Sequence, residues 1–143
     1  MTNRKAMQVG HHFERTVRWT PQEIVRFAEL VGDANPLHHD APYAATTRFG
    51  GLIASGAQTV AYLMSLCASQ TTPESPGVGL EFNFRLVGPA KPGEDILLRW
   101  EVTSVEPSER PAGTIVALRG EATGYGGRAI LTASARTLLV TKL

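Results

Sequence analysis

The second half of the chain carries the two-residue hydrophobic alternation that is typical of β-strands. Four strands are predicted there, at residues 78–86, 96–102, 114–122 and 128–140. Residues 13–19 alternate in the same way and predict one earlier strand. The segment GYGG, residues 124–127, predicts a hairpin turn between the last two strands. The segments GPAKPGED and EPSERPAG predict proline- and glycine-containing turns between the others.

The segment that follows the first strand predicts a helix instead. Thr20 is a good N-cap, Pro21 suits the first helical position, and Glu23 completes a capping box. Gly32 is expected to end this helix, because glycine readily adopts the left-handed conformation of a helix C-terminus. The predicted apolar face contains Ile24, Phe27, Ala28, Leu30 and Val31.

Two more helices are predicted before the late strands. Asp40 is placed to cap a short helix over residues 41–47. A longer helix is predicted from about Ser55 to Ser69. It is apolar on most of its circumference, so we expect protein to surround it. Cys67 lies in this helix among apolar neighbours, and we interpret it as a buried core residue rather than a nucleophile.

The order of these elements indicates the fold class. One strand, then helices, then four strands predict an α+β protein. We expect the four late strands to form an antiparallel meander whose apolar face is covered by the long helix. A curved antiparallel sheet wrapped around a long central helix is the hotdog fold. The 143 residues contain no repeat or linker, so residues 1–143 are predicted to form a single domain.

Composition and charge narrow the range of partners. The net charge is +1, so neither nucleic acid nor a membrane surface is an expected partner. The uncharged stretch 49–73 is long enough to span a bilayer, but its glycines and glutamines favour a helix buried in protein. Residues 1–13 contain charges and no apolar run, which does not fit a secretory signal. We therefore expect a cytoplasmic protein.

The candidate chemistry lies in residues 31–40, VGDANPLHHD. Pro36 forces Asn35 out of helical conformation, so the chain must turn here and could bring Asp33 and His38 side by side. A carboxylate and an imidazole that contact one water could orient it and take its proton. The alternative is a purely structural turn, because Asp and Asn often hydrogen-bond their own backbone.

The other polar residues of this loop carry weaker signals. His39 is interpreted as a solvated neighbour of His38, because adjacent residues of a turn tend to point apart. The spacing of His38, His39 and Asp40 matches no familiar zinc pattern, so no metal site is predicted.

The same loop resembles a family signature. Residues 32–44, GDANPLHHDAPYA, are similar to the signature of the MaoC-like dehydratases, which include the (R)-specific enoyl-CoA hydratases. That signature is Gly-Asp-x-Asn-Pro-aliphatic-His, five further residues, and Ala or Ser. The segments RFAEL, ATTRFGGLIASG and FRLVGPAKPGEDI also resemble the family. The similarity therefore covers nearly the whole chain, and its core motif is long enough to be specific.

The resemblance implies a hydratase or dehydratase of the hotdog fold. Such enzymes add water to a trans-2-enoyl thioester, or remove it from a 3-hydroxyacyl thioester, with the acyl group on coenzyme A or acyl carrier protein. Asp33 and His38 would activate the water, the backbone N–H of Gly56 would stabilise the enolate oxygen, and Asn35 would support the loop. No metal or redox cofactor is implied.

One position departs from the family pattern. Many members carry His-Gly before the central helix, whereas this chain has Ser55-Gly56. The N–H of Gly56 survives that change, and Ser55 is expected to support the site by touching the acyl pocket or the thioester. A family serine further along the helix aligns with Met64, next to Ser65, so its role is not carried over. Candidates to bind coenzyme A phosphates are Arg48, Arg85, Lys91 and Arg136, although each is also an ordinary surface cation.

The alternatives to a hydratase are a thioesterase and a non-catalytic chain, and the expected assembly is a dimer. A hotdog thioesterase usually relies on a carboxylate on or near the central helix, and residues 49–73 contain none. A non-catalytic chain that binds acyl thioesters, or one half of a heterodimer, is disfavoured by the intact pair Asp33 and His38. The exposed edge strand of a hotdog sheet, together with the resemblance, predicts a homodimer.

Overall fold

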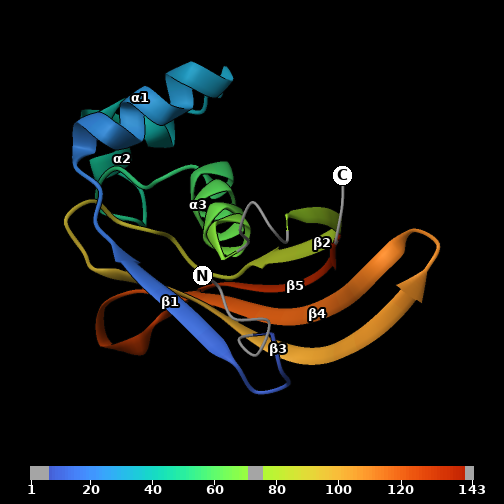
Figure 1. The fold of residues 1–143 in the computed structure, drawn as a ribbon. Helices are drawn as coiled ribbons and strands as arrows, with labels where there is room; N and C mark the ends of the chain where they lie inside the picture. The colour runs from blue at the N-terminus through green and yellow to red at the C-terminus, as the bar shows by residue number, and fades with distance from the viewer. Residues whose placement is uncertain (1–6, 71–75, 141–143) are drawn as a thin grey trace.

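A curved five-stranded sheet holds a long helix on its concave side (Figure 1). The computed structural model describes residues 7–70 and 76–140. The strands are β1 (His12–Val17), β2 (Gly77–Leu86), β3 (Ile96–Glu109), β4 (Ala112–Thr123) and β5 (Ala129–Leu139). The helices are α1 (Pro21–Val31), α2 (Ala41–Ala45) and α3 (Gly56–Ser69), with short 3-10 turns η2 (Pro36–His38) and η3 (Tyr125–Gly127). The predicted α+β hotdog architecture is confirmed.

The helix α1 begins as predicted. The hydroxyl of Thr20 accepts the N–H of Glu23, and the Glu23 carboxylate accepts the N–H of Thr20, both at 3.1 Å. Ile24 and Ala28 are buried, but Leu30 and Val31 are exposed. The predicted apolar face is therefore wrong at those two residues, because only one side of α1 packs against the rest of the fold. The helix α2 starts after its Asp40 cap as predicted and ends at Ala45, two residues early.

The strand order is β1-β3-β4-β5-β2, and every neighbouring pair is antiparallel. The strands β3, β4 and β5 form the predicted meander. The strand β2 is different, because it pairs with β5 at the far edge of the sheet and not with β3. The prediction of a four-strand meander is wrong in that respect. An alternating strand satisfies its pattern beside any neighbour, so the pattern does not select the neighbour.

The strands β3 and β4 are longer than predicted. The pairing continues to Pro107 opposite Thr114 and Glu109 opposite Ala112, so the expected turn over EPSERPAG is mostly strand. Among the described residues, β3 beyond Glu101 pairs with β4 alone. Proline is tolerated on such an edge stretch, because only one side of the strand needs its backbone donors. The predicted GYGG turn is present as η3.

The core lies between α3 and the concave face of the sheet. Trp100 of β3 is fully buried, and its indole N–H donates to the carbonyl of Leu63 in α3 at 2.8 Å. Trp100 is paired with Gly120 of β4. A Cβ at Gly120 would lie 2.6 Å from the Trp100 ring, so the absence of a side chain at position 120 makes room for the ring. The hydrogen bond from Trp100 to Leu63 helps to fix the position of α3 over the strands.

One side of α3 and most of β2 remain exposed in the single chain. Leu63, Leu66 and Cys67 are buried, whereas Met64 is 37% exposed. The expectation that protein surrounds α3 on all sides is therefore wrong for the isolated chain. The apolar residues Val78, Leu80 and Leu86 of β2 are also exposed, although their alternation predicted burial. An exposed apolar edge strand of this kind is a surface on which another chain can pair.

Two smaller expectations concern α3 and its cysteine. None of the helices in the described residues is long and apolar enough to cross a membrane. The thiol of Cys67 is buried, and burial raises its pKa to about 11. A thiol with so high a pKa stays protonated at neutral pH, as expected of a core residue.

Candidate active site

The position of Asp33 is fixed by the way α1 ends. Gly32 has φ of 76°, in the left-handed region that favours glycine. The N–H of Gly32 donates to the carbonyl of Glu29, and the N–H of Asp33 donates to the carbonyl of Ala28 at 2.8 Å. These two bonds form a Schellman motif, which ties the first residues after the helix to its last turn. Asp33 is consequently held by backbone bonds close to α1.

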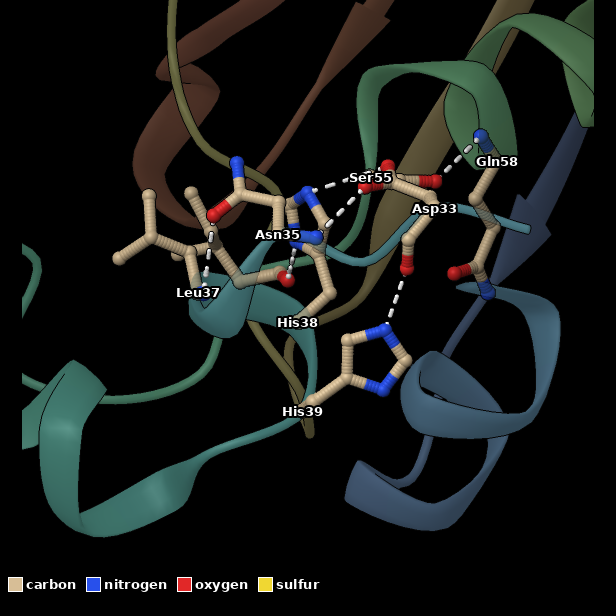
Figure 2. A network of polar contacts seen from close by, with 8 residues as sticks. Asp33, Asn35, Leu37, His38, His39, Ser55 and Gln58 are labelled. Atoms are coloured by element: carbon tan, nitrogen blue, oxygen red, sulfur yellow. Dashed lines mark hydrogen bonds and ion pairs between the residues drawn. The ribbon is translucent and has the colours of Figure 1, made fainter. Parts of the chain in front are cut away.

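The turn after Asp33 is built by Asn35 and Pro36. Asn35 is extended, with φ of −62° and ψ of 121°, as predicted for a residue before proline. Its backbone N–H donates to Oδ1 of Asp33 at 3.0 Å, and its side-chain oxygen accepts the N–H of Leu37. The short 3-10 turn η2 then directs His38 back toward Asp33 (Figure 2). Asn35 thus holds both the carboxylate and the turn.

His38 is buried, and its environment selects one tautomer. Its Nδ1 lies 2.7 Å from the carbonyl oxygen of Ile53. A carbonyl only accepts, so Nδ1 carries the proton and Nε2 of the neutral ring has a free lone pair. That Nε2 lies 3.5 Å from Oδ2 of Asp33. The two atoms are adjacent but too far apart for a good hydrogen bond, so one water could contact both.

His39 is not the solvated neighbour that was predicted. It is half-buried, and its Nε2 is hydrogen-bonded to the backbone carbonyl of Asp33 (Figure 2). Adjacent residues of the turn do point apart, but His39 points back to the segment that carries the carboxylate. The carbonyl accepts, so Nε2 of His39 carries the proton. His39 therefore stabilises the loop by joining its end to the backbone of Asp33.

The N-terminus of α3 lies next to this loop. Ser55 is the N-cap, and its buried hydroxyl accepts the N–H of Gln58 at 3.2 Å. Gly56 is the first helical residue, so its N–H has no partner within the helix. A Cβ on Gly56 would lie 2.8 Å from the side chain of Leu86, which covers it. Helix N-termini favour negative charge, which suits an oxyanion.

A cavity of about 460 Å³ connects several of these groups. Its lining includes Asn35, His38, Gly56 and Thr59, together with the loop 86–90. Asp33 does not line it but lies in a neighbouring depression of about 430 Å³ with Gly32, Pro36 and His39. Ser55 lines neither of the two, and its hydroxyl caps α3.

The other residues considered in the sequence lie in different parts of the fold. Of the four cations, Arg48 lines the 460 Å³ cavity and lies over the ring of Phe49, 5.0 Å from its centroid. Arg85, Lys91 and Arg136 do not line it. Met64 and Ser65 line a different cavity of about 510 Å³ near the C-terminal end of α3. The described residues contain no group of three or more His, Cys, Asp or Glu side chains placed to hold a metal ion.

Sequence reasoning missed two features of the site. The carbonyl of Ile53 selects the tautomer of His38, but a backbone carbonyl leaves no signal in the sequence. Gln58 is buried beside Ser55, and its side-chain oxygen has no hydrogen-bond partner in the part of the chain that the structure describes. A polar residue at position 58, in the first turn of an otherwise apolar helix, was the available signal.

Comparison with known proteins shows which family the chain is similar to. Residues 3–119 match the family model described as a MaoC like domain. The chain is 30% identical over 132 residues to the (R)-specific enoyl-CoA hydratase of Aeromonas caviae, covering 89% of this chain and 96% of that protein. It is 32% identical over 109 residues to the 3-hydroxybutyryl-CoA dehydratase of Methylorubrum extorquens, covering 70% of this chain and 68% of that protein.

Solved structures show the same fold. The (R)-hydratase from A. caviae superposes with a TM-score of 0.82 at 27% identity, covering 95% of this chain and 99% of that one. The R-hydratase PhaJ1 from Pseudomonas aeruginosa, in its unliganded form, gives a TM-score of 0.81 at 28% identity, covering 92% of this chain and 81% of that one. The similarity in fold therefore extends over nearly the whole chain.

Proposed function

Because the chain belongs to the MaoC-like domain family, we propose that it adds water reversibly to a trans-2-enoyl thioester and forms an (R)-3-hydroxyacyl thioester. The chain is an enzyme of the hydro-lyase class. The observation that carries the assignment of residues is the 3.5 Å approach of His38 Nε2 to Asp33 Oδ2. The lone pair of Nε2 lies next to the carboxylate, so a water beside both groups would meet two acceptors.

The mechanism follows from these two groups. In the hydration direction, the water donates one hydrogen bond to Asp33 and one to His38. As its oxygen bonds to the β-carbon, Nε2 of His38 takes its proton, and the carboxylate stabilises the imidazolium. The α-carbon then receives a proton from the same pair, which restores the enzyme. Asn35 holds the Asp33 carboxylate during this sequence through its backbone N–H.

Negative charge develops on the thioester oxygen when water adds. The N–H of Gly56 at the start of α3 is the proposed donor to this oxygen, because the first N–H groups of a helix are unpaired and the helix dipole favours an anion there. Gly56 and His38 line the same cavity, which supports their action on one substrate. No metal or redox cofactor takes part in the proposed reaction. Coenzyme A or acyl carrier protein carries the acyl group.

The proposed working form is a homodimer. The exposed apolar residues of β2 (Val78, Leu80 and Leu86) and the exposed Met64 of α3 support this, because a second copy joined along β2 would cover them. Such a copy would also close the open side of the α3–β2 region. Sedimentation equilibrium tests the assembly, and the mass of one chain at micromolar concentration would contradict it.

Hydration of crotonyl-CoA, followed by loss of the enoyl thioester absorbance, tests the function. Asp33→Asn keeps the shape of the side chain but removes the charge, so kcat should fall by roughly 10³-fold. Asp40→Asn is the matched control in the same loop. Asp40 caps α2 by accepting the N–H of Tyr43, and asparagine caps equally well, so this variant should keep full activity.

The results separate the competing functions. Retained kcat in Asp33→Asn would reject the proposed chemistry of this loop. Wild-type protein that binds short, long, branched and carrier-protein enoyl thioesters without turnover would favour the non-catalytic alternative. Release of free thiol from acyl thioesters would favour the thioesterase.

A further inference from the structure

A partly buried ion pair lies next to the segment 89–90 that lines the site cavity. The guanidinium of Arg128 contacts both carboxylate oxygens of Glu94, at 2.8 and 2.7 Å. The same carboxylate accepts the backbone N–H of Lys91 at 2.7 Å and that of Tyr125 at 2.9 Å. The Glu94 side chain is only 10% exposed. Four hydrogen bonds from three nitrogen atoms thus hold one carboxylate, and we call this arrangement the Glu94–Arg128 clamp.

Two glycines allow this clamp to close. A Cβ at Gly124 would lie 2.2 Å from the Glu94 carboxylate and 2.9 Å from the Arg128 guanidinium. A Cβ at Gly88 would lie 2.4 Å from the carbonyl oxygen of Ala129. Neither glycine has positive φ, so space and not backbone conformation calls for glycine at both positions. The clamp is therefore built by the chain on both sides and is not a chance surface contact.

The clamp connects to His38 through backbone hydrogen bonds. The guanidinium of Arg128 also donates to the carbonyl of Pro89 at 2.6 Å, and Pro89 and Ala90 line the site cavity. The carbonyl of Ala90 accepts the N–H of Ala54 at 2.9 Å. Ala54 directly follows Ile53, whose carbonyl accepts Nδ1–H of His38. A clamp that fixes Pro89 and Ala90 therefore also fixes the Ile53 carbonyl, which selects the tautomer of His38.

We propose that Glu94 and Arg128 are positioning residues, which keep the Ile53 carbonyl on Nδ1 of His38 through Pro89, Ala90 and Ala54. When the clamp opens, the Ile53 carbonyl loses its fixed place and the proton of His38 is free to move to Nε2. A ring with its proton on Nε2 cannot take a proton from water at that atom. The kinetic consequence rests on the proposed function, whereas the state of the His38 ring does not.

The experiment joins kinetics to the nitrogen NMR signals of His38 in the free protein. In Glu94→Gln the charge of the clamp is lost, and in Gly124→Ala a methyl group separates the two side chains with both charges kept. In each variant the NMR chemical shifts of the two ring nitrogens of His38 should move toward each other, because the two tautomers become mixed. Each should also lower kcat for crotonyl-CoA by about ten- to a hundredfold, with a smaller change in KM, because the general base is misplaced.

The matched control is one residue away. Arg18 and Asp95 form an ion pair at 2.9 Å, but both side chains are 63% exposed and neither lines the site cavity. Asp95→Asn should leave the His38 signals and kcat as in the wild type, because exposed pairs contribute little. His38→Gln assigns the His38 signals by their loss.

Each outcome decides the proposal. Folded Glu94→Gln with unchanged His38 signals overturns it, even if kcat falls, because the clamp then has only a structural role. If Glu94→Gln does not fold, Gly124→Ala is judged by the same criterion. Shifted His38 signals in a protein that lacks hydratase activity in the wild type would support the positioning role and reject the proposed function.

Discussion

The two ends of α3 are held in the fold by different interactions. At the N-terminal end, hydrogen bonds dominate: the Ser55 cap, the bond from Ala54 to Ala90, and the contact of His38 with the Ile53 carbonyl. Toward the C-terminal end, Leu66 and Cys67 pack on the sheet and are buried, and an open cavity of about 510 Å³ lies beside Met64. The proposed chemistry is at the N-terminal end, where directional bonds fix the atoms.

This difference has a physical reason. Hydrophobic contact contributes stability in proportion to buried area but has no preferred direction. A hydrogen bond contributes less net stability than the burial of a large apolar side chain, but it fixes the relative orientation of the two groups that it joins. The proposed general base, His38, and the proposed oxyanion donor, Gly56, must be oriented, so polar contacts are needed around them. The far end of α3 needs only burial.

The largest expected effect on stability is at the far end. Leu66 is 2% exposed, and Leu66→Ala should reduce the free energy of unfolding by about 2–5 kcal/mol through lost burial and a cavity. Met64→Ala, two residues earlier, should reduce it by less than Leu66→Ala does, because 37% of Met64 is exposed in the single chain. Urea unfolding measures both. Equal losses of unfolding free energy in the two variants would contradict the stated difference between the buried and the exposed side of α3.

A smaller effect on stability, present at neutral pH and lost in acid, is expected beside the N-terminal end of α3. Burial of Glu94 opposes its charge, but the N–H groups of Tyr125 and Lys91 and the side chain of Arg128 outweigh this and lower its pKa below the ordinary 4.5. A carboxyl with a lowered pKa stabilises the fold above its unfolded pKa and loses that contribution as pH falls through its folded pKa. The clamp should therefore weaken in acid.

Urea unfolding of the wild type and Glu94→Gln, from about pH 7 to about pH 3, measures this contribution. The wild type should lose its advantage over Glu94→Gln below the ordinary pKa of 4.5. Leu66→Ala should stay less stable than the wild type by the same amount at every pH, because no ionisable group is removed. An advantage of the wild type over Glu94→Gln that does not change with pH would contradict the assignment.

Local sequence determined the elements and the loop chemistry. The Thr20 and Glu23 capping box, the end of α1 at Gly32 and the extended Asn35 before Pro36 all rest on interactions within a few residues. Such contacts have the same partners in any fold, so the sequence alone predicts them. The loop that brings Asp33 and His38 together is of this kind, and so was predicted.

Tertiary structure decided which elements meet. The pairing of β2 with β5, the exposure of Leu30 and the extension of β3 through Pro107 depend on neighbours far apart in the chain. The acceptor for Nδ1 of His38 is the carbonyl of Ile53, fifteen residues away, and a backbone carbonyl is the same in every residue. Sequence specifies the groups that can react, and their orientation is set by backbone atoms that only the fold brings into place.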